Sequence, residues 1–169
     1  MELLEGLLSR RSIRHYDAQK TITPADLKTV LQMAMYAPSA MNKRPWEFIV
    51  VTDKKMLQEI AQKHPYAAFM PEAGTAVVVC ENTAEAFAGH GPEDIALASA
   101  NFMLAAHGLG YGTCYCGVAP NEDREALFAE LLKTPSHIRP YCVIAVGTPL
   151  KQPSHPDRVE ENKIHYNGW

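Results

Sequence analysis

Three arginines and a serine within five residues form the segment of this chain best suited to hold an anion. They stand near the N-terminus, in the run Arg10-Arg11-Ser12-Ile13-Arg14. Guanidinium groups this close together repel one another unless an anion or carboxylates lie nearby. Each guanidinium offers a planar fork of donors that matches phosphate oxygens, and the Ser12 hydroxyl adds a further donor. The alternative interpretation is a solvated cluster on the surface.

A second candidate for binding is the loop over residues 37–46, with the sequence Ala-Pro-Ser-Ala-Met-Asn-Lys-Arg-Pro-Trp. Pro38 and Pro45 enclose small and polar residues between a helical segment and a strand-like one, which makes the turn stiff. A rigid loop with exposed backbone donors suits a planar ligand. The alternative interpretation is a well-made connection between helix and strand.

The glycine string Gly108-Leu-Gly-Tyr-Gly112 does not indicate a dinucleotide-binding loop. That loop follows a strand and opens a helix, whereas these glycines follow a helical segment and precede a strand. A helix end with a tight turn explains them. The chain also lacks the Gly-x-x-x-x-Gly-Lys-Ser/Thr pattern, so the sequence gives nucleotide hydrolysis no support.

The four cysteines, Cys80, Cys114, Cys116 and Cys142, are expected to be reduced, buried and small apolar residues. The spacings typical of zinc sites are missing, so we expect no metal. Cys114 and Cys116 would point to one face of a strand, which makes a redox-sensing pair an alternative, although neighbours on one strand form strained disulfides. Most of the seven histidines are expected on the surface; His15 and His107 lie near the candidate sites.

Composition excludes several function classes. With 47% hydrophobic and 21% charged residues, the 169-residue chain fits one soluble domain over residues 1–169. A net charge of −3 spread along the chain argues against a nucleic-acid partner. No apolar run approaches the ~18 residues that span a bilayer, and the acidic start is unlike a signal peptide. We therefore expect a cytoplasmic protein without a membrane partner.

Five helices are predicted from caps and periodicity. Thr23 and Pro24 open a helix that ends before Pro38, and Asp53 and Asn121 cap two others. A short helix is expected over residues 2–9. The segment 92–109 reads as a long helix that is apolar nearly all round, which predicts a central, buried helix able to line a subunit contact.

The pattern predicts five short strands, of which four can be placed. They lie at residues 46–51, 75–80, 113–118 and 141–146, where β-branched and apolar residues follow one another. Helices that alternate with such strands predict a layered α+β or α/β domain. The polar tail over residues 149–169 has no core of its own, so we expect it to lie across another surface.

Taken together, these segments resemble the FMN-dependent nitroreductase family, and the resemblance covers nearly the whole chain in the right order. Arg10 to Arg14 is similar to the family's flavin-phosphate segment, and Ala37-Pro38-Ser39 with Asn42 and Pro45-Trp46 to its signature loop. Residues 94–106 and 113–117 resemble its dimer helix and flavin-edge strand, and residues 158–169 its C-terminal tail. The resemblance implies an α+β, three-layer α/β/α sandwich with a mostly antiparallel central sheet, homodimeric with a C-terminal arm.

The same resemblance implies a role for each matching residue. Arg10, Arg11 and Ser12 would hold the FMN phosphate and ribityl chain, joined by Arg158, and Arg14 would reach the pyrimidine edge of the flavin. The remaining contacts would come from the backbone at the end of one strand and from the partner subunit's loop: Cys116 and Gly117 near flavin N5 and O4, and Pro38, Ser39 and Asn42 over the other end of the ring. Two positions depart from the family, which usually has Gln where this chain has Arg44 and often where it has Ala100.

The implied activity is an FMN-dependent oxidoreductase with NADH or NADPH as electron donor. Hydride would reach flavin N5, and a nitroaromatic, quinone or similar acceptor would take the electrons in a ping-pong cycle. No side chain is required as a dedicated acid or base, so none is predicted to be catalytic. Specialised flavin chemistry on the same fold, such as enone reduction or dehalogenation, remains an alternative, as does a non-catalytic flavin-binding or redox-sensing module.

Overall fold

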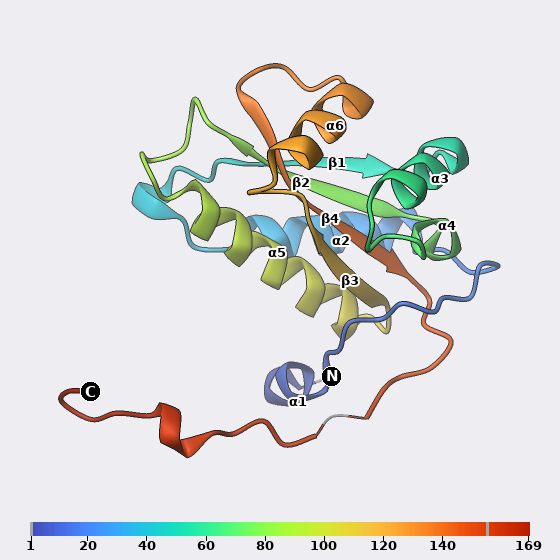
Figure 1. The fold of residues 1–169 in the computed structure, drawn as a ribbon. Helices are drawn as coiled ribbons and strands as arrows, with labels where there is room; N and C mark the ends of the chain where they lie inside the picture. The colour runs from blue at the N-terminus through green and yellow to red at the C-terminus, as the bar shows by residue number, and fades with distance from the viewer. Residues whose placement is uncertain (1, 155) are drawn as a thin grey trace.

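A computed structural model describes residues 2–154 and 156–169 and shows helices on both faces of one sheet (Figure 1). The sheet has four strands in the order β1-β2-β4-β3, and every neighbouring pair is antiparallel. The strands are β1 (Trp46–Val51), β2 (Ala76–Asn82), β3 (Gly112–Gly117) and β4 (Ile138–Gly147). All four placed strands are confirmed. The prediction of a fifth was wrong for the described residues, because no further β-branched run is left.

The two central strands are buried on both faces, and their alternating side chains enter two separate cores. In β2, Val78 and Cys80 join one cluster, whereas Val77 and Val79 join the other. This follows from the two-residue period of a strand. A nearly continuous apolar run such as Val77 to Cys80 is therefore the signature of a strand covered on both sides.

Helices form the two outer layers. On one face, α2 (Pro24–Met35) and α5 (Gly91–Gly108) bury residues such as Val30 and Phe102. On the other, α3 (Lys54–Lys63), the short α4 (Met70–Ala73) and α6 (Glu122–Leu132) bury residues such as Leu57, Met70 and Phe128. The predicted three-layer α/β/α sandwich is confirmed. The helix α4 was not predicted, because four residues are too few to show a periodic pattern.

Local capping signals place three of the helices as expected. The side chains of Thr23, Asp53 and Asn121 accept hydrogen bonds from backbone N–H groups in the first turns of α2, α3 and α6. The prediction that α5 is buried nearly all round was wrong for the single chain. Its buried side follows one face, and Leu97 on another side is 43% exposed. Its apolar composition therefore leaves an uncovered apolar side.

The N-terminal segment links the end of α5 to the edge of the sheet. After α1 (Leu3–Ser9), the Ser9 hydroxyl lies 2.8 Å from Nε2 of His107 near the end of α5. The Ile13 N–H then donates to the Thr113 carbonyl at 2.9 Å, and Ser12 forms a parallel bridge with Thr113. The arginine-rich segment thus runs beside the beginning of β3.

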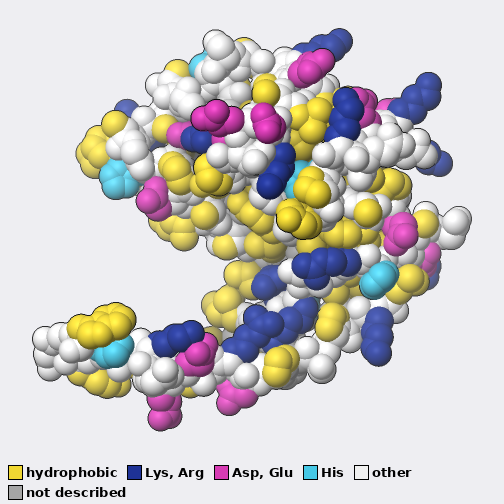
Figure 2. Space-filling model, in the orientation of Figure 1, with side chains coloured by type: hydrophobic (Ala, Val, Ile, Leu, Met, Phe, Trp, Pro, Cys, Tyr) yellow, Lys and Arg dark blue, Asp and Glu magenta, His cyan; other side chains and the backbone are white. Residues whose placement is uncertain are grey.

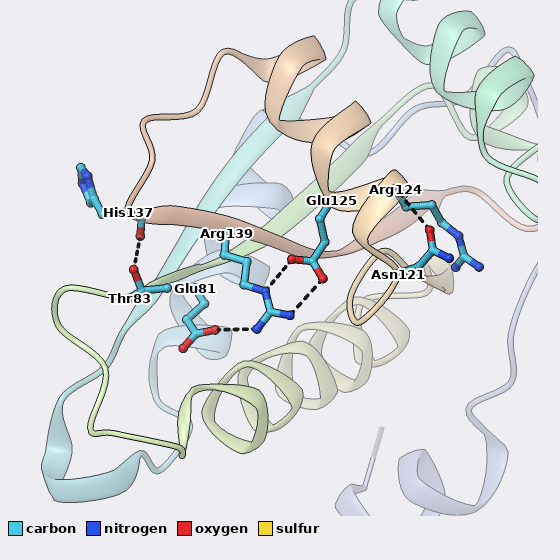
Figure 3. A network of polar contacts seen from close by, with 7 residues as sticks. All are labelled: Glu81, Thr83, Asn121, Arg124, Glu125, His137 and Arg139. Carbon is cyan, nitrogen blue, oxygen red and sulfur yellow. Dashed lines mark hydrogen bonds and ion pairs between the residues drawn. The ribbon is translucent and has the colours of Figure 1, made fainter.

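An ion-pair network fastens α6 to the sheet (Figure 3). Arg139 on β4 donates to both carboxylate oxygens of Glu125 on α6, at 2.6 and 2.9 Å. Its other terminal nitrogen lies 3.8 Å from the Glu81 carboxylate on β2. Glu81 in turn packs against Gly91 at the start of α5, where a Cβ atom would collide with the carboxylate. Burial raises the pKa of Glu81 above its ordinary value, and the Arg139 charge opposes that rise.

Beyond β4, the described tail has little contact with the layers. Its residues from Leu150 onward are exposed, including Tyr166 and Trp169, and its one helical turn is η2 (Glu161–Lys163). Figure 1 shows it passing below α1 and continuing away from the sheet. Among the described residues, the structure has no helix with the length and apolar character needed to cross a membrane.

Candidate functional site

A groove of about 540 Å³ brings together three arginines from opposite ends of the sequence. Arg10, Arg11 and Arg158 line it, together with Leu7 and Leu8 of α1 and one carboxylate, that of Asp157. Figure 2 shows Lys and Arg side chains gathered in the hollow between the body of the molecule and the tail. The structure therefore places Arg158 beside Arg10 and Arg11, as the resemblance implied.

Arg11 has a structural task that its sequence position did not reveal. Its Nη1 donates to the carbonyl of Leu8 at 2.9 Å and to that of Arg10 at 2.7 Å, so it closes the C-terminal end of α1. Burial lowers the pKa of Arg11, and repulsion from Arg158 and Arg10 lowers it further. Its Nε is buried without a hydrogen-bond partner. An anion at this position would relieve the repulsion.

The next groove along the N-terminal segment, of about 450 Å³, also carries basic side chains. Ser12 and Arg14 line it together with Lys151 and Ser154 of the tail. Lys151 is an addition to the predicted residues. The sequence carried no signal for it, because only the return of the tail places it near Ser12.

A third groove, of about 490 Å³, lies along the edge of β3. It contains the predicted Arg14, Cys116 and Gly117 and adds aromatic side chains from the connection between α3 and α4, namely Tyr66 and Phe69. Arg14 lines both this groove and the preceding one, and Ser12 of the preceding groove follows Arg11 of the first groove directly in the chain, so the three grooves follow the N-terminal segment in order. The row begins at the arginine cluster and ends at an apolar, aromatic wall.

The free edge of β3 supplies backbone groups to this third groove. β3 is the last strand of the sheet, and the Thr113 carbonyl points away from β4 toward Ile13. Backbone groups alternate in direction along a strand, so those of Gly117 point the same way. The Gly117 carbonyl accepts from Nη1 of Arg124 at 2.8 Å and is 3.0 Å from Nε2 of His64.

Cys114 and Cys116 lie side by side on one face of β3, as the strand period predicted. Both are buried, and all four cysteines are free. The Cys116 thiol donates to the Tyr66 carbonyl at 3.3 Å. Its neighbour Cys114 and its burial raise the pKa of the Cys116 thiol, which keeps that thiol protonated.

The loop carrying Pro38, Ser39 and Asn42 lies elsewhere in the same chain. Oδ1 of Asp94, near the start of α5, accepts from the Ala40 N–H at 2.8 Å, whereas the arginine cluster adjoins His107 at the helix end. A rise of about 1.5 Å per residue separates Asp94 from His107 by about 20 Å. One chain therefore does not bring the loop to the grooves.

The loop is held in a demanding backbone conformation. Met41, Asn42 and Arg44 all have positive φ values, at 51°, 55° and 53°. Left-handed backbone costs free energy in residues other than glycine and persists where the surroundings fix it. Besides Asp94, the Ser39 hydroxyl holds the loop by accepting from the Arg44 N–H at 2.9 Å. Two positions depart from the residues usual in the family: Arg44 is exposed in this loop, and Ala100 is half-buried on α5.

Most of the described histidines are exposed, as expected: His15, His90, His137 and His165. Two are buried. His64 is 1% exposed and His107 is 6% exposed. Burial, followed by the charges of Arg10 and Arg11, lowers the pKa of His107. Neither position could be found from local sequence, because each partner lies far along the chain: Gly117 for His64 and Ser9 for His107.

Comparison with known proteins agrees with this architecture. The sequence matches the model of the Nitroreductase family over residues 7–64 and 57–148. The chain belongs to the nitroreductase family. A relative from Methanothermobacter thermautotrophicus, named "Putative NADH dehydrogenase/NAD(P)H nitroreductase", is 39% identical, with 100% of this chain and 88% of the relative covered.

Solved structures of other nitroreductase-family proteins have the same fold. One from Parabacteroides distasonis, which carries the same name as that relative, has a TM-score of 0.95 at 35% identity, covering 99% of this chain and 98% of the other. An FMN-dependent nitroreductase from Clostridium difficile has a TM-score of 0.90 at 28% identity, covering 98% and 99%. The similarity to these structures covers both helical layers and the tail.

Proposed function

We propose that this chain forms a single FMN-binding domain over residues 1–169 and works as an FMN-dependent NAD(P)H oxidoreductase. The observation that carries the proposal is the row of three grooves, which joins the arginine cluster to the edge of β3. FMN has the same sequence of parts: a phosphate, a polar ribityl chain and a flat ring. The names of nitroreductase relatives support the cofactor and the nicotinamide donor.

The residues present fit FMN chemically. Within the described residues, the ion pairs found leave out Arg10, Arg11 and Arg158, so these three charges lack a carboxylate partner at ion-pair distance. The orphaned Nε of Arg11 is a further donor in need of an acceptor. A phosphate dianion satisfies both requirements, because guanidinium forks match its oxygens.

In the second and third grooves, the side chains suit the remaining parts of the cofactor. Ser12 and Lys151 are donors for the ribityl hydroxyls. Arg14 places positive charge at the pyrimidine edge, where it stabilises negative charge on the reduced ring. Gly117 contributes backbone at the N5 side of the ring, and Tyr66 contributes an aromatic wall.

The chemistry that FMN supplies when bound is the exchange of electrons between a reduced nicotinamide and an oxidised acceptor. The chain's part is to bind and orient the flavin and to stabilise its negative charge, and it needs no side chain as acid or base. An open groove with a flat aromatic wall suits flat acceptors such as nitroaromatics and quinones. One groove that accepts donor and acceptor in turn gives ping-pong kinetics.

A homodimer would complete the site. The loop with Pro38, Ser39 and Asn42 is about 20 Å from the arginine cluster of its own chain, by the helical rise along α5. A second copy could present this loop to the ring groove of the first. The uncovered apolar residues of α1 and α5, among them Leu4, Leu8 and Leu97, supply a surface for such pairing.

Steady-state kinetics of the FMN-loaded protein tests the proposed activity. NADH or NADPH is varied at several fixed concentrations of a nitroaromatic or of p-benzoquinone, and loss of the nicotinamide absorbance is followed. Turnover with parallel double-reciprocal lines is expected. Turnover with lines that intersect would contradict the ping-pong cycle, and absence of turnover with all of these acceptors would contradict the proposed function.

A further inference from the structure

His64 is a buried histidine that lines none of the three grooves. Packing in the core does not explain why a polar residue stands at this position. It follows directly after α3 and is 1% exposed. Its Nδ1 accepts from the Tyr66 N–H at 3.2 Å. Because Nδ1 is an acceptor, the ring proton is on Nε2, which donates to the Gly117 carbonyl at 3.0 Å. Both nitrogens of the ring therefore have fixed partners.

The carbonyl that His64 contacts belongs to the last residue of β3. Gly117 has no side chain to restrict its backbone, and beyond it the chain leaves the strand toward Val118 and α6. The Val118 N–H donates to the Tyr141 carbonyl, so β4 holds the chain immediately after Gly117. The outer side of the Gly117 peptide depends on groups outside the sheet.

Arg124 provides the second of these groups. Its Nη1 donates to the same carbonyl at 2.8 Å, and its guanidinium lies 6.0 Å from the centre of the Tyr66 ring. Thus α6 holds the Gly117 carbonyl through Arg124, and the α3–α4 connection holds it through His64. Two donors on one carbonyl fix its direction more firmly than one does.

We infer that His64 and Arg124 are positioning residues for the flavin ring. They fix the Gly117 carbonyl, which belongs to the peptide unit that joins Gly117 to Val118. They thereby help to set the direction of the Gly117 N–H, which lies in the preceding peptide unit at the β3 edge. N–H and C=O of one residue point to the same side of an antiparallel strand, so restraining the carbonyl restrains the donor. The inference rests on the proposed function, since it assumes that FMN lies in this groove.

His64 also couples this peptide to the groove wall. The Tyr66 N–H bond to Nδ1 and the Cys116 bond to the Tyr66 carbonyl hold the backbone of Tyr66 from both sides. The Tyr66 side chain is 69% exposed and lines the same groove. One imidazole therefore orients a backbone donor at the ring edge and an aromatic wall beside it.

The test compares His64→Asn with His64→Gln in the FMN-loaded protein. Asparagine can accept from the Tyr66 N–H but is too short to reach the Gly117 carbonyl, whereas glutamine carries an N–H donor at the position of Nε2. Arg124→Met removes the second donor from a half-exposed site where folding is not at risk. Phe128→Leu is the matched control, because Phe128 is fully buried and lies edge-on to the His64 ring at 6.1 Å.

The readouts are the FMN dissociation constant, from quenching of flavin fluorescence, and the position of the visible flavin absorption band. For His64→Asn we expect the dissociation constant to rise about tenfold with a shifted band, as loss of one oriented hydrogen bond gives. Arg124→Met should change both in the same direction. For His64→Gln and Phe128→Leu, the FMN dissociation constant should stay within about twofold of that of the unchanged protein, and the flavin absorption band should not shift.

The inference is overturned if His64→Asn and Arg124→Met keep the dissociation constant and band of the unchanged protein. It is equally overturned if Phe128→Leu reproduces their effect, since the role of His64 would then be packing alone. If His64→Asn does not fold, Arg124→Met decides. Failure of the unchanged protein to bind FMN would instead refute the proposed function, so the two failures are distinguishable.

Discussion

At the scale of single residues, three positive charges gather in one groove that has a single carboxylate, Asp157, in its lining. Arg10, Arg11 and Arg158 share this groove; burial lowers the pKa of Arg11, and repulsion from the other two guanidiniums lowers it further. Of the three, Arg11 also closes α1, so its replacement would disturb the helix as well as an anion. Arg10 and Arg158 are the cleaner positions at which to test phosphate binding.

Arg10→Ala is expected to weaken FMN binding by roughly 10- to 100-fold, the value of a hydrogen bond to a charged group. Arg158→Ala should act in the same direction, because it removes charge from the same groove. Fluorescence titration with FMN measures both effects. Lys28→Ala, which removes an exposed positive charge on α2, is the control and should bind FMN normally. Equal affinities for all four proteins would contradict phosphate binding at this cluster.

His107 predicts a pH dependence of the stability of the FMN-free protein. Burial and the charges of Arg10 and Arg11 hold its folded-state pKa below the ordinary value of about 6.5. Below that value the unfolded chain takes up a proton that the folded chain does not, so this contribution to stability is lost as the pH falls. Glu81, whose pKa is raised, changes the stability with pH in the opposite direction. Its contribution cancels when the protein is compared with a His107 variant that keeps Glu81.

The comparison is with His107→Gln, which retains an amide for the contact with Ser9. Urea denaturation at pH 7.5 and 5.5 should show a larger loss of stability on acidification for the unchanged protein than for the variant. Equal losses in both proteins would mean that His107 titrates as it does in the unfolded chain.

At the scale of elements, local signals determine where the helices form, whereas long-range contacts determine which residues meet in the site. The caps at Thr23, Asp53 and Asn121 could be predicted because each acts within one turn of its own helix. The strand segments could be predicted because their apolar runs are short and rich in β-branched residues. The order β1-β2-β4-β3 depends on pairings between distant segments, which no local pattern specifies.

The same distinction separates the site residues that were found from those that were missed. The dense run from Arg10 to Arg14 stands out locally, whereas Arg158 was assigned only through the family resemblance. His64, Lys151 and Arg124 gave no signal, because their roles come from contacts with Gly117 or Ser12 across the fold.

The ion pairs of Arg139 are expected to stabilise the folded protein by holding α6 against the sheet. Arg139→Met leaves the carboxylates of Glu125 and Glu81 without their cation. Since the Arg139 side chain is 36% exposed, solvent screening limits the loss to about 1–2 kcal/mol. Urea denaturation at pH 7 measures it. Lys63→Met breaks the exposed pair with Glu59 and should cost at most about 0.5 kcal/mol; equal losses would refute the estimate.

At the scale of the whole molecule, the two parts of the proposed site lie at opposite ends of α5. Asp94 fixes the strained loop near one end, and His107 adjoins the arginine cluster at the other. In the proposed dimer, two copies are arranged so that each loop meets the other copy's grooves. A twofold-symmetric dimer produces two such sites at once.

This arrangement predicts complementation between two damaged variants, assayed at an FMN concentration that saturates the unchanged protein but does not load Arg10→Ala. Arg10→Ala damages the phosphate end, and the double variant Pro38→Gly with Ser39→Ala damages the loop. Random reassortment gives heterodimers in about half of the dimers, each with one intact site of two, so roughly a quarter of normal activity should return. The variants are unfolded together, refolded as a mixture and assayed for NAD(P)H oxidation. Refolding each alone is the control, and a mixture no more active than the average of the two would contradict a shared site.

The central claim is that this chain binds FMN and that NAD(P)H reduces it there. An absorbance spectrum of the purified protein, followed by anaerobic titration with NADH and with NADPH, tests that claim most directly. The account predicts flavin bands that bleach as nicotinamide is added and return when a nitroaromatic or quinone is supplied. A protein that stays colourless after incubation with FMN, or flavin bands that neither nicotinamide bleaches, would contradict it.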